Sequence, residues 1–95
     1  MTLKFFISVG NEEVLAFRWK DNVCSLGGFA RNLMYIERLI SEYLSDQTPR
    51  PKQTQKNKIR FDIRMNKEKF SAIVDSMQSS GVTMTPTKSF KRVMF

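Results

Sequence analysis

The sequence has no histidine and a single cysteine, Cys24, among its 95 residues. One cysteine cannot form an internal disulfide, and without histidine there is neither a His/Cys zinc set nor a Cys-His or Ser-His catalytic pair. No two carboxylates have a spacing that recommends them for general acid and base chemistry. We therefore expect no metal, no cofactor and no enzymatic activity.

Long apolar runs are also missing, because no segment approaches the roughly 18 to 20 apolar residues that span a bilayer. The first residues, MTLKFFISVGNEE, lack a basic region followed by an apolar stretch and a cleavage site. The sequence predicts a cytoplasmic protein without membrane contact. Its 41% hydrophobic and 12% aromatic residues predict a folded chain, and its length suits one domain.

Positive charge is concentrated in one half of the chain. Residues 1–46 carry five basic and six acidic side chains, a net charge of −1, whereas residues 47–95 carry eleven basic and three acidic ones, a net charge of +8. Such a concentration is typical of a protein that binds a polyanion, and it also occurs in proteins that dock on acidic protein partners.

The first 46 residues predict a β-hairpin followed by a long helix. Apolar residues alternate on both sides of Gly10-Asn11, a pair that suits a tight turn: Leu3, Phe5, Ile7 and Val9 before it, and Leu15, Phe17 and Trp19 after it. From Ser25 onwards the spacing becomes helical, with Phe29, Leu33, Ile36, Ile40 and Tyr43 in one stripe. Gly27-Gly28 then forms a flexible start of this helix.

The apolar stripe of this helix is wider than a two-stranded hairpin covers, because Ala30, Met34, Leu39 and Leu44 extend it. Either a second subunit or the rest of one monomeric core packs against it. We expect a homodimer.

Residues 47–57, QTPRPKQTQKN, have no apolar side chain and predict a basic, proline-containing linker or arm. In KIRFDIRMN, residues 58–66, Ile59, Phe61, Ile63 and Met65 alternate with charged residues, which predicts a strand. Asn66 suits the N-cap of a helix from Lys67 to Ser80, and Gly81 suits its end.

Residues 82–95 leave two alternatives open. Either a strand over 82–86 completes a βαβ unit with residues 58–65, or Thr85 caps a short final helix. The predicted fold class is therefore α+β, in the order ββαβα plus a last α or β element. Units 1–46 and 58–95 are expected to share one core.

With a helical tail, residues 58–95 resemble the ribbon-helix-helix family of DNA-binding regulators, the Arc and MetJ type. The likeness lies in RFDIRMNKEKFSAIVDSMQSSGVTMT, with an alternating strand, a helix and a Gly-x-Thr-x-Thr turn. It implies that Arg60, Asp62 and Arg64 enter the major groove on a ribbon made by two subunits, and that the turn at Thr83 and Thr85 meets a phosphate. Residues 1–46 are not covered by it.

The sequence thus predicts a small basic nucleic-acid-binding protein, a dimeric regulator or accessory factor with DNA favoured over RNA. Its expected contact residues are Arg50, Lys52, Lys56, Lys58, Arg60, Asp62, Arg64, Thr83, Thr85 and Lys88. In a second version of this hypothesis, an open sheet holds single-stranded nucleic acid or RNA, with Phe6, Trp19 and Phe90 as stacking candidates. The alternative is an inhibitor or accessory subunit that docks on an acidic protein surface.

Overall fold

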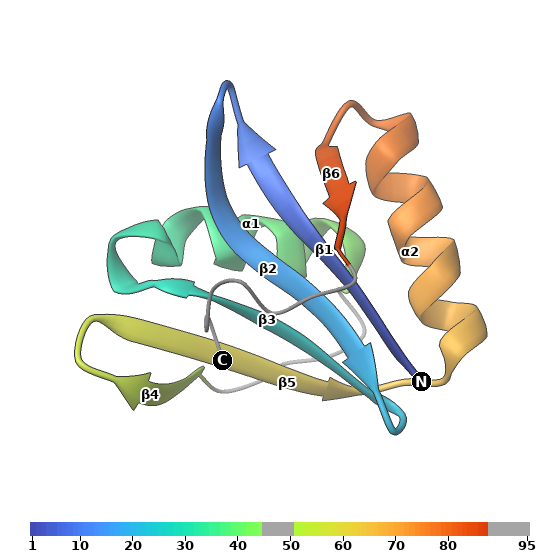
Figure 1. Cartoon of the computed structure of the whole chain (residues 1–95), viewed down its shortest axis with the longest axis horizontal. Coiled ribbons are helices and arrows are strands. Elements are labelled where there is room, and N and C mark those ends of the chain that lie inside the picture. Colours follow the sequence, from blue (N-terminus) through green and yellow to red (C-terminus); the bar gives the residue numbers. More distant parts are fainter. Residues whose placement is uncertain (45–50, 88–95) are drawn as a thin grey trace.

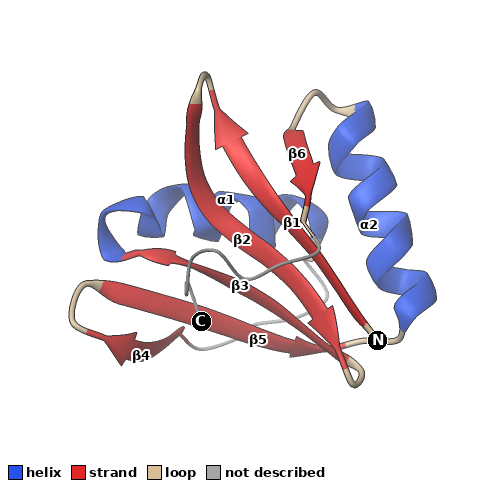
Figure 2. Ribbon diagram, in the orientation of Figure 1, coloured by secondary structure: helices blue, strands red, loops and turns tan. Residues whose placement is uncertain are grey.

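A computed structural model describes residues 1–44 and 51–87, and the side chains of residues 53 and 54 are not described. Six strands and two α-helices follow one another along these residues (Figures 1 and 2). Their bounds are β1 Thr2–Val9, β2 Glu12–Lys20, β3 Val23–Phe29, a 3-10 turn η1 Ala30–Asn32, α1 Leu33–Tyr43, β4 Pro51–Gln55, β5 Lys58–Arg64, α2 Lys67–Ser79 and β6 Thr83–Pro86. The predicted order of elements is therefore wrong, because β3 and β4 were missed.

The six strands form one antiparallel sheet in the order β4-β5-β3-β2-β1-β6. Both helices pack on the same face of it, and α1 crosses behind the strands in Figure 1. One core joins that face of the sheet to the buried side chains of α1 (Ile36, Leu39 and Ile40) and of α2 (Phe70, Ile73, Val74 and Met77). The ring of Phe70 stacks on Phe17 of β2 with centroids 4.7 Å apart.

Three tight turns connect the antiparallel strands. The turn at Gly10-Asn11 has Gly10 at φ +62°, as a hairpin requires. The turn between β2 and β3 places both Asp21 and Asn22 at positive φ, which is the pattern of a type I′ turn. Between β4 and β5, Asn57 has φ +67°. Asparagine and aspartate tolerate this backbone region better than most residues.

Residues 23–29 form a central strand, where the sequence predicted the start of a helix. The helix begins only at Leu33, after η1. Gly28 has a packing role here, because a Cβ added to it would lie 3.0 Å from the Val14 oxygen and 3.5 Å from Ile36 Cδ1. The absence of a side chain lets α1 lie close against the sheet.

Residues 51–57, within the segment predicted as a basic linker or arm, belong to the sheet. Residues Pro51–Gln55 form an edge strand, and Lys56-Asn57 is the hairpin turn to β5. This strand is held by backbone hydrogen bonds to β5 and needs no alternating apolar side chains. Pro51 is compatible with it because one side of an edge strand has no ladder to complete.

The helix predicted over residues 67–80 is present as α2, with both of its expected ends. Asn66 Oδ1 accepts a hydrogen bond from Lys69 N at 2.8 Å. At the other end Gly81 has φ +92°, Val82 N donates to Met77 O, and Gly81 N donates to Gln78 O. This is the hydrogen-bond pattern of a Schellman motif.

After α2 the chain forms a strand, β6, so Thr85 is not the cap of a helix. β6 pairs antiparallel with β1, at the opposite edge of the sheet from β4, and is not adjacent to β5. The βαβ unit expected from residues 58–86 is therefore wrong. The part of the alternative helix beyond residue 87 lies outside the described residues.

β5 is hydrogen-bonded on both sides within its own chain, to β3 and to β4. The intersubunit ribbon that the family resemblance implies is therefore not formed by this strand. Most of the apolar stripe of α1 faces the core of the single chain: Ile36 and the adjoining Leu44 are fully buried and Leu39 is 2% exposed, whereas Met34 is 79% exposed. The homodimer stays a prediction, now without the argument that this stripe needs a second subunit.

Candidate nucleic-acid interface

The sheet has a second face, opposite the helices, on which basic side chains gather. Because side chains alternate along a strand, the residues between the core positions point to this side. We call it the basic face and define it by Lys4 and Phe6 of β1, Ala16, Arg18 and Lys20 of β2, Ser25 and Phe29 of β3, Lys52 of β4, and Lys58, Arg60, Asp62 and Arg64 of β5.

The strand registers place these side chains in rows that run across the sheet. One row contains Lys20, Val23 and Arg64; the next contains Lys4, Arg18, Ser25 and Asp62; and a third contains Phe6, Ala16, Gly27, Arg60 and Lys52. Seven basic side chains lie on this face. The acidic residues on it are Asp62 and, beside Ser8 at its far end, Glu13. Pairing of strands from both halves of the sequence therefore builds a single positively charged surface.

The exposure of the basic face is graded across the sheet. Lys4 is 4% exposed, Phe6 is 6% exposed and Ser25 is 1% exposed, so these residues are buried. Arg18, Lys58 and Arg60 are half-buried, and Lys20, Lys52 and Arg64 are exposed. The accessible part of the face therefore lies over β5, β4 and the neighbouring ends of β2 and β3.

Asp62 lies among cations on β5. Its Oδ1 accepts a hydrogen bond from Ser25 Oγ at 2.6 Å and lies 3.1 Å from Arg60 Nε, and its Oδ2 lies 3.4 Å from Lys52 Nζ. A cavity of about 340 Å³ beside it is lined by Arg18, Lys20, Asp21, Val23, Ser25, Arg60 and Asp62. The carboxylate orients Arg60 and partly compensates the local positive charge.

Lys4 lies at the buried end of the face, with its Nζ 5.2 Å from the centre of the Phe6 ring. Burial lowers the pKa of Lys4 below its ordinary value, and the charge of Arg18 lowers it further. Both causes disfavour the protonated amine. Lys4 is therefore a buried amine outside the accessible part of the face.

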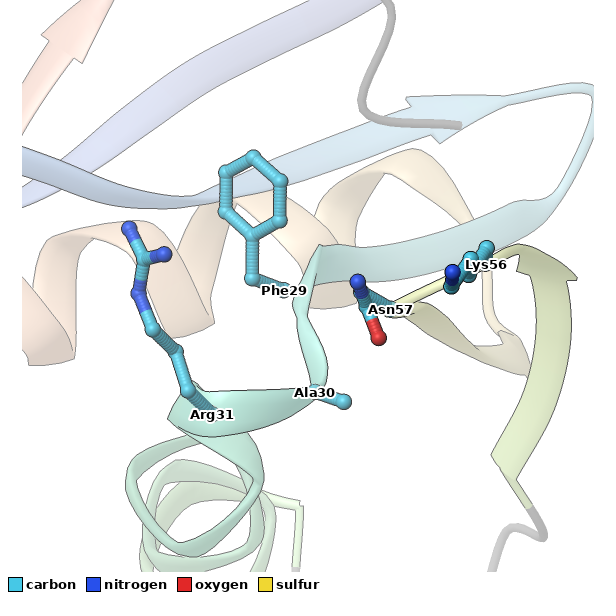
Figure 3. A pocket seen from close by; sticks show the side chains of 5 residues that line it. All are labelled: Phe29, Ala30, Arg31, Lys56 and Asn57. Carbon is cyan, nitrogen blue, oxygen red and sulfur yellow. The ribbon is translucent and has the colours of Figure 1, made fainter.

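Phe29 ends β3 with its ring on the basic face, packed against Phe6 and Ala16. The guanidinium carbon of Arg31 lies 4.7 Å from the ring centre and the Lys58 ammonium lies 5.6 Å from it. A cavity of about 380 Å³ opens here, lined by Phe29, Ala30, Arg31, Lys56 and Asn57 (Figure 3). An aromatic ring thus lies at a cavity whose rim carries basic side chains.

The structure brings five of the predicted contact residues together on the basic face: Lys52, Lys58, Arg60, Asp62 and Arg64. Lys56 lies at the adjoining turn and is exposed. Thr83 and Thr85 point to the same side of the sheet, since Met84 between them is in the core, but they lie on β6 at the edge opposite β4, beside Ser8 and Phe6. Because they belong to a strand, they do not present the amides of a helix N-terminus to a phosphate, contrary to what the family resemblance implies. Arg50 and Lys88 lie outside the described residues.

Of the stacking candidates, Phe6 lies on the basic face but is buried. Trp19 points to the helix side, packs against the core and donates its Nε1 hydrogen to Met65 O at 3.0 Å. Its role is therefore structural. Phe90 lies outside the described residues.

Lys4, Arg18, Lys20 and Phe29 also belong to the basic face, and Arg31 lines the cavity beside Phe29; the sequence-based prediction did not include these residues. For the first three a signal was present, because they occupy the polar positions between the apolar residues of the predicted hairpin. Their charge was hidden when residues 1–46 were counted together, since acidic residues elsewhere in that half cancel it. Phe29 also fits the helical spacing of Leu33 and Ile36, so the sequence predicts it on the helix.

No protein family, curated protein or solved structure was found to match this chain. Within residues 1–44 and 51–87 there is no group of three acidic or cysteine side chains placed to hold a metal ion. No helix in this described part is long and apolar enough to cross a membrane.

Proposed function

We propose that this protein binds single-stranded nucleic acid on its basic face. The observation that carries the proposal is the convergence of basic side chains from β1, β2, β4 and β5 on one face of a sheet whose other face holds both helices. Basic side chains that neutralise several phosphates release counterions from the nucleic acid. The resulting affinity does not depend on the base sequence. A cytoplasmic location belongs to this proposal.

A single strand suits this surface better than a duplex. Six strands at the usual spacing make a sheet about 24 Å wide, whereas the major groove of B-DNA is about 12 Å wide and admits a two-stranded ribbon. Arg60 and Asp62 lie inside the sheet, between β3 and β4, so they do not project from an edge. A flexible single strand can follow the face and bring its phosphates to these cations.

Titration of the full chain with labelled single-stranded DNA, single-stranded RNA, duplex DNA and poly-glutamate, at two salt concentrations, tests the proposal. We expect tighter binding of the single strands than of the duplex. The logarithm of the binding constant should fall with the logarithm of salt by roughly 0.7 per phosphate contact. DNA and RNA share the phosphates and bases involved, and the two arms of the titration separate them.

Variants locate the site. Arg64→Ala and Lys20→Ala, on exposed positions of the same row, should each weaken binding and reduce the salt slope by roughly 0.7. Arg38→Ala removes an exposed charge from α1, on the helix layer, and should change neither quantity. Equal binding of poly-glutamate would instead favour the acidic protein partner. No binding of either single strand would overturn the proposal.

A further inference from the structure

We infer that the cavity beside Phe29 is a pocket for one unpaired nucleobase, an inference that rests on the proposed single-strand binding. The pocket would take a base by stacking and its adjoining phosphates by charge. It lies where β3 ends, next to the turn between β4 and β5, at one end of the basic face.

The size and chemistry of the cavity suit a base. Its volume of about 380 Å³ lies within the range of small-ligand sites, roughly 300 to 1,000 Å³. Phe29 is half-buried, so its ring is fixed on one side by Phe6 and Ala16 and remains partly accessible. Base stacking on aromatic rings is favourable for every base because each has a π-face.

Arg31 extends the stacking surface. Its guanidinium lies beside the Phe29 ring, as Figure 3 shows, while Asn57 and Lys56 lie on the other side. A guanidinium held against a ring presents its second planar face, on which a base also stacks. The side-chain amide of Asn57 offers both a donor and an acceptor to the edge of a base. Arg31, Lys56 and Asn57 are all exposed, so a ligand can reach them.

The backbone around the pocket is held in place. Ala30 N donates to Asn57 O at 2.7 Å, which fixes the start of η1 to the turn between β4 and β5. Asn57 adopts positive φ in this turn. The next residue, Lys58, is the first of β5 and pairs with Phe29 of β3. The backbone that carries the ring, the cations and the amide is thus held in place before a ligand arrives, which reduces the entropy lost on binding.

The pocket is continuous with the phosphate-binding cations. Lys58 lies over the Phe29 ring, and Arg60, two residues further along β5, lies in the next row with Lys52. A strand whose base enters the pocket therefore has basic side chains beside it for the neighbouring phosphates. The geometry favours a strand that is anchored by one base and continues over β5.

The test compares two oligonucleotides of about 12 residues, short enough to occupy one binding site. One has an entirely abasic sugar-phosphate backbone, and the other carries a single thymine in its middle. Both have the same charge, so the proposed phosphate contacts treat them alike. The full chain is titrated with each, together with an ordinary thymine oligonucleotide of the same length.

For the unmodified protein we expect the single thymine to increase affinity roughly 5- to 150-fold, the range that one stacked base supplies. Phe29→Leu keeps an apolar side chain in the sheet and should lose this increase, while its salt slope stays the same. Phe29→Trp should retain the increase. Thermal unfolding of both variants checks that the sheet is intact.

Equal affinity of the unmodified protein for the abasic and the thymine-containing strand, with normal binding of the ordinary oligonucleotide, would overturn the pocket and leave the proposed function standing. An undiminished increase in Phe29→Leu would also overturn it, because the base would then be held elsewhere. Failure to bind the ordinary oligonucleotide would overturn the proposed function, and the pocket with it.

Discussion

Asp62 shows how one residue sets the charge of the basic face. It is bound to Ser25 and lies beside Arg60 and Lys52, so its carboxylate opposes the attraction of a nearby phosphate. We predict that Asp62→Asn increases affinity for single-stranded DNA about fivefold at low salt, since a charge interaction in water-accessible surroundings is worth about 1 kcal/mol. Fluorescence titration measures this change.

Asp75→Asn is the matched control, because it removes an exposed carboxylate from α2. It should leave affinity unchanged. A large loss of affinity in Asp62→Asn would mean that the carboxylate itself accepts a hydrogen bond from a base, such as a cytosine amino group, and would contradict this role.

Cys24 is a residue of β3, and its side chain is fully buried in the core. Burial raises the pKa of its thiol far above the ordinary 9.0, and the charge of Asp62 raises it further. The thiolate is the reactive form, so the folded protein should react with iodoacetamide only as fast as it unfolds. Labelling should become rapid in concentrated urea. Rapid labelling of the folded protein would contradict this burial.

The raised pKa of the Cys24 thiol also makes the stability of the protein depend on pH. The unfolded thiol ionises near its ordinary pKa of 9.0, while the folded thiol does not. The stability that this group contributes is therefore complete below pH 9 and is lost as the pH rises further. Cys24→Ala should remove this part of the alkaline loss of stability in urea unfolding.

At the scale of elements, β3 and α1 depend on each other through Gly28. A Cβ at this position would lie 3.0 Å from the Val14 oxygen and 3.2 Å from Leu15 Cβ, beneath Ile36. We predict that Gly28→Ala lowers the free energy of unfolding by about 1 to 3 kcal/mol, as overpacking of a core does. Urea denaturation measures this free energy. An unchanged midpoint would mean that the sheet accommodates the added methyl group without loss of stability.

Elements with a strong local pattern could be predicted from the sequence. The hairpin at Gly10-Asn11, the strand over 58–64 and the capped helix α2 each carry their own turn, alternation or cap. β3 could not be recognised, because Phe29 continues the helical spacing of α1 and two glycines precede it. β4 could not be recognised either, since PKQTQ has no apolar alternation and is paired through its backbone.

The candidate site was predicted in part for a related reason. The charged side of β5 follows from alternation alone, so Arg60, Asp62 and Arg64 could be named. Arg18 and Lys20 lie far from β5 in the sequence, and only the pairing of β3 with both β2 and β5 brings them to the same face. That pairing is a tertiary contact, which local spacing does not encode.

At the scale of the whole molecule, the homodimer remains a prediction of the sequence. In the structure one chain buries Ile36, Leu39 and Ile40 of α1 and also presents the basic face, so the proposed binding needs no second subunit. Sedimentation equilibrium at micromolar protein tests the dimer directly. A single monomeric species would contradict the sequence-based expectation without affecting the proposed site.

Lysine footprinting tests the central claim, that the basic face holds a single strand, most directly. The full chain is acetylated briefly with and without saturating single-stranded DNA, and each lysine is measured by mass spectrometry. We predict strong protection of Lys20, Lys52 and Lys58, on the basic face, and unchanged modification of Lys67, exposed at the start of α2. Protection of Lys67 with full modification of the basic-face lysines would contradict the account.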